Sequence, residues 1–141
     1  MSNIQCLHEI CLAKDISIAT AESCTSGLLS VKITSIAGAS SFFKGGVIAY
    51  QNTIKINTLG VSQLVIEEKT EVCSDVVESM AKGVRKKFAV DFSIATTGYA
   101  GPTGGNKLNP IGTVFIAISS KKKTISKRFI FTGNRESVIN Q

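Results

Sequence analysis

The sequence Phe92-Ser93-Ile94-Ala95-Thr96-Thr97 leads directly into a loop, from Gly98 to Pro110, that determines how the sheet is built. The segment 92–97 is rich in apolar and β-branched residues, which predicts a strand. The loop contains four glycines and both prolines of the chain, and it leaves no room for a crossover helix. Because parallel neighbours need such a crossover, we expect the next strand to run in the opposite direction.

Two further strands are predicted before this segment. Residues 16–20 alternate like a strand, and residues 45–50 form a continuous apolar run that predicts a strand covered on both faces. Helical spacing of apolar residues predicts helices over residues 2–14 and 28–36. Because helices separate them, the first three strands should be parallel to one another.

The middle of the chain predicts three helices. Two short helices are expected over residues 52–60 and 62–69, with Ser62 as the candidate cap of the second. Asp75 and Glu78 have the spacing of a capping box at the start of a long apolar stripe. This stripe is the strongest helical pattern in the sequence.

The last part of the chain predicts a hairpin and completes the fold class. Residues 112–119 and 124–131 form two strands joined by a lysine-rich turn at residues 121–123. The sequence therefore predicts an α/β protein with a mixed, mostly parallel sheet of about five strands, one of them antiparallel. Helices on both faces would give a three-layer α/β/α unit. With 141 residues, the chain has the size of a single domain, 1–141.

The composition argues against several classes of protein. No apolar run approaches the roughly 20 residues of a membrane helix, and the amino terminus lacks a signal-peptide pattern. We therefore expect a cytoplasmic protein without a membrane partner. The four cysteines form no CxxC pair and His8 is the only histidine, so neither a metal nor another cofactor is predicted. The net charge is +6, but the lysines are dispersed and aromatic residues are few. An anionic small molecule is favoured over nucleic acid.

Polar and glycine-rich segments follow the predicted strands at one edge of the sheet. Ser23 follows the first strand, Tyr50 and Asn52 follow the second, Thr97–Gly105 follows the third, and Arg135 follows the last. Ligands of open α/β sheets bind outside the carboxyl ends of the strands. The sequence therefore predicts a single site at this edge.

The turn Glu22-Ser23-Cys24-Thr25-Ser26-Gly27 has two interpretations. The N-terminus of the helix that follows could hold an anion or an oxyanion on its unpaired N–H groups. Alternatively, Ser23 or Thr25 only caps that helix. Lys55 also has two interpretations. Burial would lower its pKa and make it the base for Ser23, as in Ser-Lys enzymes, whereas most lysines are solvated.

The glycine-rich loop and the arginine leave alternatives open as well. Residues 97–105 match neither GxxxxGK[ST] nor GxGxxG, so the loop is either a cradle for phosphate or ribose or a structural loop. Arg135 suits a carboxylate or a phosphate, and a surface ion pair is the other interpretation.

Taken in order, these motifs resemble the carboxyl-terminal domain of the CinA family, whose stand-alone members are nicotinamide mononucleotide deamidases. The resemblance covers nearly the whole chain. It rests on Ala21–Thr25 with Gly27, Gly45–Tyr50 with Asn52 and Lys55, Leu59–Val61, Thr97-Gly98, Ala100–Pro102, Gly104-Gly105, Pro110, Gly112–Val114, and Gly133 with Arg135.

The resemblance implies an amidohydrolase of pyridine nucleotide recycling that converts nicotinamide mononucleotide to nicotinate mononucleotide and ammonia without a metal. It implies that Ser23 is the nucleophile, Lys55 the base and Tyr50 a further catalytic residue. The residues expected to bind the substrate are Thr25, Asn52, Thr97, Gly98, Ala100, Gly101, Gly105 and Arg135. A homo-oligomer is expected, with a symmetric dimer favoured.

The sequence departs from the family pattern in a few places. Ser26 stands where glycine is usual, Asn134 where aspartate commonly precedes the arginine, and Tyr99 where an aliphatic residue is usual. The family continues for about one helix beyond Arg135, whereas this sequence ends at Gln141, so the domain is expected to lack its final helix. Two alternatives to the enzyme remain. The missing helix favours a catalytically weak nucleotide-binding or partner-binding module. The family's historical name and the positive charge favour a basic accessory protein connected with competence.

Overall fold

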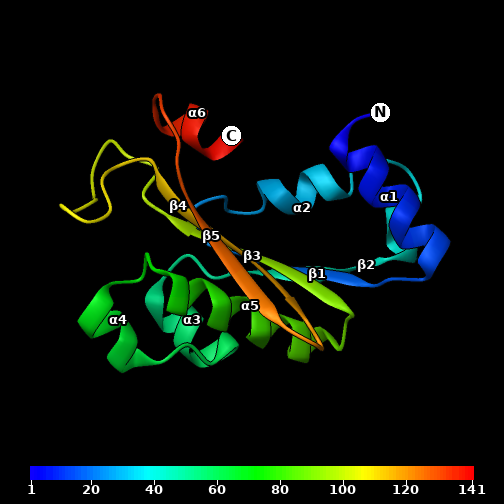
Figure 1. Cartoon of the computed structure of the whole chain (residues 1–141), viewed down its shortest axis with the longest axis horizontal. Helices are drawn as coiled ribbons and strands as arrows, with labels where there is room; N and C mark the ends of the chain where they lie inside the picture. The colour runs from blue at the N-terminus through cyan, green and yellow to red at the C-terminus, as the bar shows by residue number, and fades with distance from the viewer.

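Five strands form one sheet in the order β2-β1-β3-β4-β5 (Figure 1). The computed structural model describes all residues, 1–141. The strands are β1 (Ile18–Glu22), β2 (Phe43–Ile48), β3 (Phe92–Gly98), β4 (Thr113–Ser120) and β5 (Thr124–Ile130). Strand β1 pairs in parallel with both β2 and β3, whereas β4 is antiparallel to β3 and β5. The predicted mixed sheet with one antiparallel strand is therefore confirmed.

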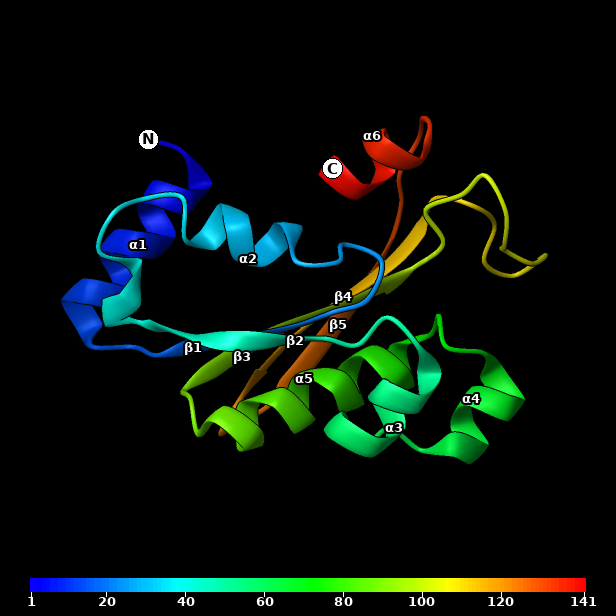
Figure 2. The ribbon, with the colours of Figure 1, turned by 180° about the vertical axis from the view of Figure 1, so that it is seen from behind.

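Helices cover both faces of the sheet, which confirms the three-layer arrangement. Figures 1 and 2 show helices on both sides of the sheet. One layer contains α3 (Asn52–Leu59), α4 (Gln63–Lys69) and α5 (Ser74–Phe88). The other contains α1 (Asn3–Lys14), α2 (Leu28–Ile33) and α6 (Arg135–Asn140), with a short 3-10 helix at Ala39–Ser41. None of these helices is both long and apolar enough to cross a membrane.

The main core lies between α5 and the sheet. The apolar stripe of α5 packs onto alanines of β1, β3 and β4, whose small side chains let the helix approach closely. Gly83 of α5 also brings α3 into place. A Cβ at Gly83 would lie only 2.0 Å from the carbonyl oxygen of Leu59, at the end of α3. The absence of a side chain at this position therefore sets how closely α3 packs against α5.

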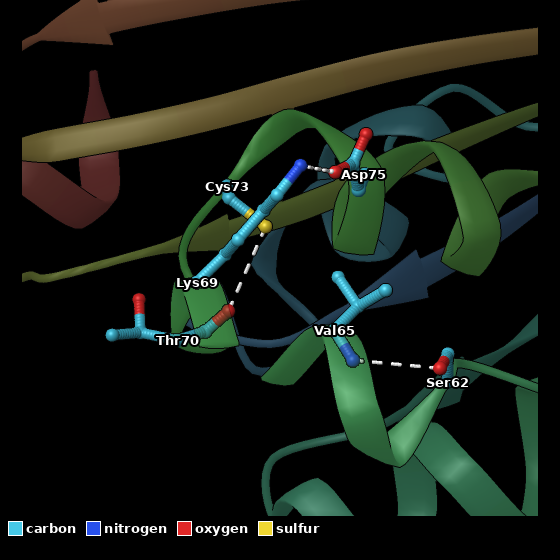
Figure 3. Close-up of polar contacts among 6 residues, drawn as sticks. All are labelled: Ser62, Val65, Lys69, Thr70, Cys73 and Asp75. Carbon is cyan, nitrogen blue, oxygen red and sulfur yellow. Dashed lines mark hydrogen bonds and ion pairs between the residues drawn. The ribbon is translucent and has the colours of Figure 1, made fainter. Parts of the chain in front are cut away.

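Several details differ from the sequence predictions. Strand β2 is half-exposed, with alternating burial, instead of covered on both faces, because it lies at the edge of the sheet. The N-cap of α5 is Cys73, without a side-chain hydrogen bond, so the predicted capping box at Asp75 and Glu78 is wrong. Asp75 instead pairs with Lys69 (Figure 3). Helix α2 ends at Ile33, three residues earlier than predicted.

Two caps at other positions are informative. The Ser62 hydroxyl accepts a hydrogen bond from the Val65 N–H, which confirms the predicted cap of α4 (Figure 3). No helix was predicted after the strand at residues 124–131, but a helix begins at Arg135. The Asn134 side chain caps this helix by accepting from the Ser137 N–H.

The carboxylate of Glu22 connects the end of β1 to the start of α2. Glu22 is only 1% exposed, and its carboxylate accepts four hydrogen bonds from the protein. The donors are the backbone N–H groups of Leu29 (2.8 Å) and Ser30 (3.0 Å) and the hydroxyls of Thr25 (2.5 Å) and Ser30 (2.6 Å). A buried carboxylate is stable only when its oxygens are satisfied in this way. The turn between β1 and α2 therefore has one defined conformation.

We predict that Glu22→Ala lowers the free energy of unfolding by about 3–5 kcal/mol, because it leaves several buried donors without an acceptor. Urea unfolding would measure the change. Glu68→Ala, at an exposed position of α4, is the control and should change stability by less than about 0.5 kcal/mol. Equal stability of the two variants would show that the Glu22 hydrogen bonds are not what holds this turn.

Candidate active site

A cleft of about 160 Å³ lies at the carboxyl edge of the parallel strands. The ends of β1 and β3, the segment after β2, helix α3, the segment before α5, and α6 all contribute to its walls. The lining residues are Ser23, Cys24, Tyr50, Asn52, Lys55, Glu71, Gly98, Ala100 and Arg135. The sequence had predicted that polar segments meet at this edge, and the structure brings them together there.

Ser23 is the first residue after β1. Its N–H donates to the carbonyl of Thr96 on β3 at 3.1 Å, which extends the parallel pairing by one residue. The side chain is 7% exposed, and its hydroxyl makes no hydrogen bond within the protein. The backbone N–H groups of Cys24 and Thr25 are likewise without an acceptor in the protein. A free hydroxyl and free N–H donors therefore stand next to each other in this turn.

The sequence suggested that the turn either caps α2 or leaves the N-terminus of α2 free for an anion, and both predictions are wrong. The N-cap of α2 is Gly27, and neither Ser23 nor Thr25 caps the helix. The N-terminus of α2 is not open to a ligand anion either, because the Glu22 carboxylate already occupies it. The negative charge expected at this helix end is supplied by the protein itself.

Lys55 is buried in the wall of the cleft. It lies on α3 and is 1% exposed, so it is not the solvated lysine that was the alternative. Its amine donates to the carbonyl oxygen of Tyr50 at 3.2 Å and has no acidic partner within ion-pair distance. Burial lowers the pKa of Lys55, and the negative charge of Glu71 opposes this shift only in part. The structure shows no direct hydrogen bond between this amine and Ser23.

Tyr50 connects Lys55 to Arg135. Its carbonyl accepts from Lys55, and its hydroxyl accepts from the Arg135 guanidinium at 2.7 Å. Arg135 also donates to the carbonyl of Gly101 at 2.8 Å. The amine and the guanidinium therefore bind opposite ends of the same tyrosine. Arg135 makes no ion pair within the protein, so the surface ion pair considered from the sequence is not formed.

The remaining predicted residues divide into two groups. Asn52, Gly98 and Ala100 line the cleft. Four others lie behind its walls or beside it, where they hold the surrounding segments. The Thr25 hydroxyl contacts Glu22 and Thr96, the Thr97 hydroxyl donates to the Glu71 carbonyl at 2.9 Å, the Gly101 carbonyl accepts from Arg135, and Gly105 packs against the backbone of Ile111.

Two lining residues, Cys24 and Glu71, were not predicted. Cys24 is adjacent to Ser23 in the quoted turn, and burial raises the pKa of its thiol to about 11. Glu71 lies between α4 and α5 and belongs to no recognisable motif, so no signal in the sequence could have identified it. No three His, Cys, Asp or Glu side chains lie close enough together to hold a metal ion.

Together these features define a three-layer α/β/α domain with a serine and a buried lysine in one cleft at the carboxyl edge of its parallel strands. The family model of the CinA C-terminal domain matches residues 3–141. The chain therefore belongs to the CinA family, as the resemblance of its motifs implied.

Individual relatives agree with this assignment. A CinA-like protein of Flavobacterium psychrophilum is 44% identical over 135 residues, which cover 96% of this chain and 32% of that protein. A CinA-like protein of Geotalea daltonii is 42% identical over 122 residues, which cover 86% of this chain and 30% of that protein. The chain thus spans about a third of the length of the curated relatives it matches.

A solved structure is also similar over almost the whole chain. The competence damage-inducible protein A (ComA) of Klebsiella pneumoniae superimposes with a TM-score of 0.92 at 32% sequence identity. The match covers 96% of this chain and 84% of that one. The fold of the domain and its family are therefore established together.

The lowered pKa of Lys55 has a consequence for stability. Between that pKa and the ordinary value of 10.5, the folded chain binds fewer protons than the unfolded chain. Stability should therefore rise with pH in this window. We predict that Lys55→Met is more stable than the wild type by about 1 kcal/mol at pH 7 and that the difference shrinks as the pH approaches 10.5.

Urea unfolding at pH 7 and pH 10 would measure this effect. Lys82→Met, which replaces an exposed lysine of α5, is the matched control and should change stability by less than about 0.5 kcal/mol at both pH values. A Lys55→Met variant that is destabilised equally at both pH values would contradict the argument.

Proposed function

We propose that this domain is an amidohydrolase that converts nicotinamide mononucleotide to nicotinate mononucleotide and ammonia. The observation that carries this proposal is the buried Lys55, which has no acidic partner within ion-pair distance and shares a cleft with a serine whose hydroxyl is free. A lysine with a lowered pKa can accept a proton from a serine near neutral pH. The chemistry needs no metal and no cofactor.

The reaction would proceed through a covalent intermediate. The Ser23 oxygen attacks the carboxamide carbon while the neutral Lys55 amine accepts the hydroxyl proton, directly or through one water. The free N–H groups of Cys24 and Thr25 are suited to stabilise the oxyanion that develops. Lys55 then donates the proton to the leaving nitrogen, and ammonia departs. A water molecule attacks the resulting ester while Lys55 accepts one of its protons, the bond from the acyl carbon to the Ser23 oxygen breaks, and Lys55 returns the proton to that oxygen as the acid is released.

Cys24 is the other nucleophile that lines the cleft. A thiol reacts as its thiolate, and burial raises the pKa of this thiol to about 11. At neutral pH it therefore remains protonated. Like Ser23, it would need a base to act as a nucleophile, so the comparison of Ser23→Ala with Cys24→Ala decides between the two.

Arg135 is suited to bind the phosphate of the mononucleotide. Its guanidinium has donors left after the bonds to Tyr50 and Gly101, and no carboxylate neutralises it. Tyr50 separates it from Lys55, so the anionic part of the substrate and the amide would bind at different ends of the cleft.

A second candidate function is a binding module without turnover. The absence of a direct hydrogen bond between Ser23 and Lys55 favours it, because the base must reach the hydroxyl for catalysis. Ammonia release from nicotinamide mononucleotide decides between the two. We further propose that the protein works in the cytoplasm as a homodimer. Its four free cysteines fit the reducing compartment.

We predict that Ser23→Ala lowers the turnover number for ammonia release by about 1,000-fold or more, because the nucleophile is lost. The matched variant Cys24→Ala should retain more than about a tenth of the activity. A coupled ammonia assay with nicotinamide mononucleotide measures both. A larger loss of activity in Cys24→Ala than in Ser23→Ala would identify Cys24 as the nucleophile. Near-normal activity in both variants would contradict the covalent mechanism.

We predict that Arg135→Ala weakens binding of nicotinamide mononucleotide by about 10–100-fold, through the loss of charge-assisted hydrogen bonds. Binding of the riboside, which has no phosphate, should change by less than about twofold. Lys107→Ala removes an exposed positive charge that does not line the cleft and should affect neither ligand. An equal loss for both ligands in Arg135→Ala would show that the arginine does not contact the phosphate.

A further inference from the structure

Glu71 is an acidic residue of the cleft that the mechanism above does not use. It lines the same cavity as Ser23 and Lys55. Its carboxylate makes no hydrogen bond within the protein, and the only ion pair of the structure joins Lys69 and Asp75. Among the charges around Lys55, that of Glu71 has the largest influence on the amine. Glu71 therefore shares the cleft with the two groups that the proposed reaction uses.

The segment that carries Glu71 is firmly held. The Thr97 hydroxyl donates to the Glu71 carbonyl at 2.9 Å, and the Asn109 side chain donates to the carbonyl of Val72 at 3.1 Å. The Tyr99 hydroxyl donates to the Thr70 hydroxyl at 3.2 Å. These three donors come from β3 and the loop after it, so the segment is fixed against the floor of the cleft.

The helices on either side of this segment are also tied together. Figure 3 shows the Cys73 thiol donating to the Thr70 carbonyl at 3.6 Å, and the pairing of Lys69 with Asp75 across the connection from α4 to α5. Glu71 lies within the stretch of sequence that both contacts span. Its backbone is thus positioned by several bonds, while its carboxylate is left without a partner. Because Glu71 is only half-buried, its carboxylate needs no protein partner and is available to a ligand in the cleft.

The chemistry of the proposed reaction indicates what such a group can do. The substrate carries a neutral carboxamide, whose nitrogen has two N–H donors, and the product carries a carboxylate, which has none. An ionised glutamate can only accept hydrogen bonds. It is attracted to the first group and repelled by the second, and close contact of like charges is costly in a partly buried site.

We propose that Glu71 determines the preference of this cleft for a carboxamide over a carboxylate. It accepts a hydrogen bond from the amide nitrogen of the substrate and repels the carboxylate of the product, which promotes product release. This inference rests on the proposed amidohydrolase function and adds a specificity residue to it.

The test compares the binding of substrate and product to a variant that cannot hydrolyse the substrate. In the Ser23→Ala chain, calorimetry would give the dissociation constants of nicotinamide mononucleotide and nicotinate mononucleotide. We expect the amide to bind at least about tenfold more tightly. Adding Glu71→Gln should reduce this ratio to within about twofold, mainly through tighter binding of the acid, because glutamine is neutral and can donate to a carboxylate.

Two further variants make the result specific. Glu71→Asp keeps the charge and should retain most of the preference. Glu68→Gln removes an exposed carboxylate of α4 and should leave the ratio unchanged. A ratio unaffected by Glu71→Gln would overturn the proposal, and so would an equal weakening of both ligands. Thermal unfolding of each variant would identify any that fails to fold, and if Glu71→Gln does, Glu71→Ala, which also removes the charge, takes its place.

Failure of this inference is distinguishable from failure of the proposed function. Ammonia release by the wild-type chain tests the function alone. If the wild-type chain releases no ammonia but Glu71→Gln abolishes the preference for the amide, the proposed function fails and the role of Glu71 in selectivity stands. If the wild-type chain releases ammonia but Glu71→Gln leaves the affinity ratio unchanged, the proposed function stands and the role of Glu71 fails. Absence of binding by either compound would overturn the role of Glu71.

Discussion

The buried carboxylate of Glu22 is the interaction on which the site depends. It ends β1, accepts hydrogen bonds from N–H groups in the first turn of α2 and holds the Thr25 hydroxyl, so it fixes the turn that carries Ser23. Its surroundings are built to accommodate it. The Ser30 hydroxyl that donates to Glu22 also contacts the Thr20 hydroxyl at 2.7 Å. A Cβ at Gly46 of β2 would lie 2.2 Å from that Thr20 oxygen, so only glycine fits there.

The two halves of the cleft come from opposite layers of the domain. Ser23 stands on the turn toward α2, whereas Lys55 stands on α3, in the layer that packs through α5 onto the sheet. The sheet is the common support, since Ser23 pairs with β3 and the Glu71 segment is bonded to the same strand by Thr97. This division explains why the amine is so well buried. The Lys55 amine reaches the cleft from the α3 side of the sheet, and the apolar packing around α3 excludes water from the amine.

The sequence was sufficient to predict the mixed sheet, because the loop from Gly98 to Pro110 allows only a reversal of direction. It also predicted that Ser23, Tyr50, Lys55 and Arg135 would meet, since the carboxyl ends of parallel strands share an edge. It could not predict the role of Glu22, because the donors follow seven and eight residues later and after a turn with positive φ angles at Ser26 and Gly27. Nor could it identify Glu71, whose position depends on Thr97, a residue 26 positions away in the sequence. Local patterns describe elements well, whereas contacts between distant segments require the assembled fold.

The missing side chain at Gly83 makes the geometry of the cleft sensitive to a position outside its lining. Leu59, whose carbonyl lies against Gly83, is one helical turn beyond Lys55 on the same buried face of α3. Any larger residue at Gly83 would push this helix outward and carry the amine with it, while most of the core stayed in place. A substitution at this glycine would therefore change the position of Lys55 in the cleft from a distance. A search for important residues that considers only the cleft would overlook it.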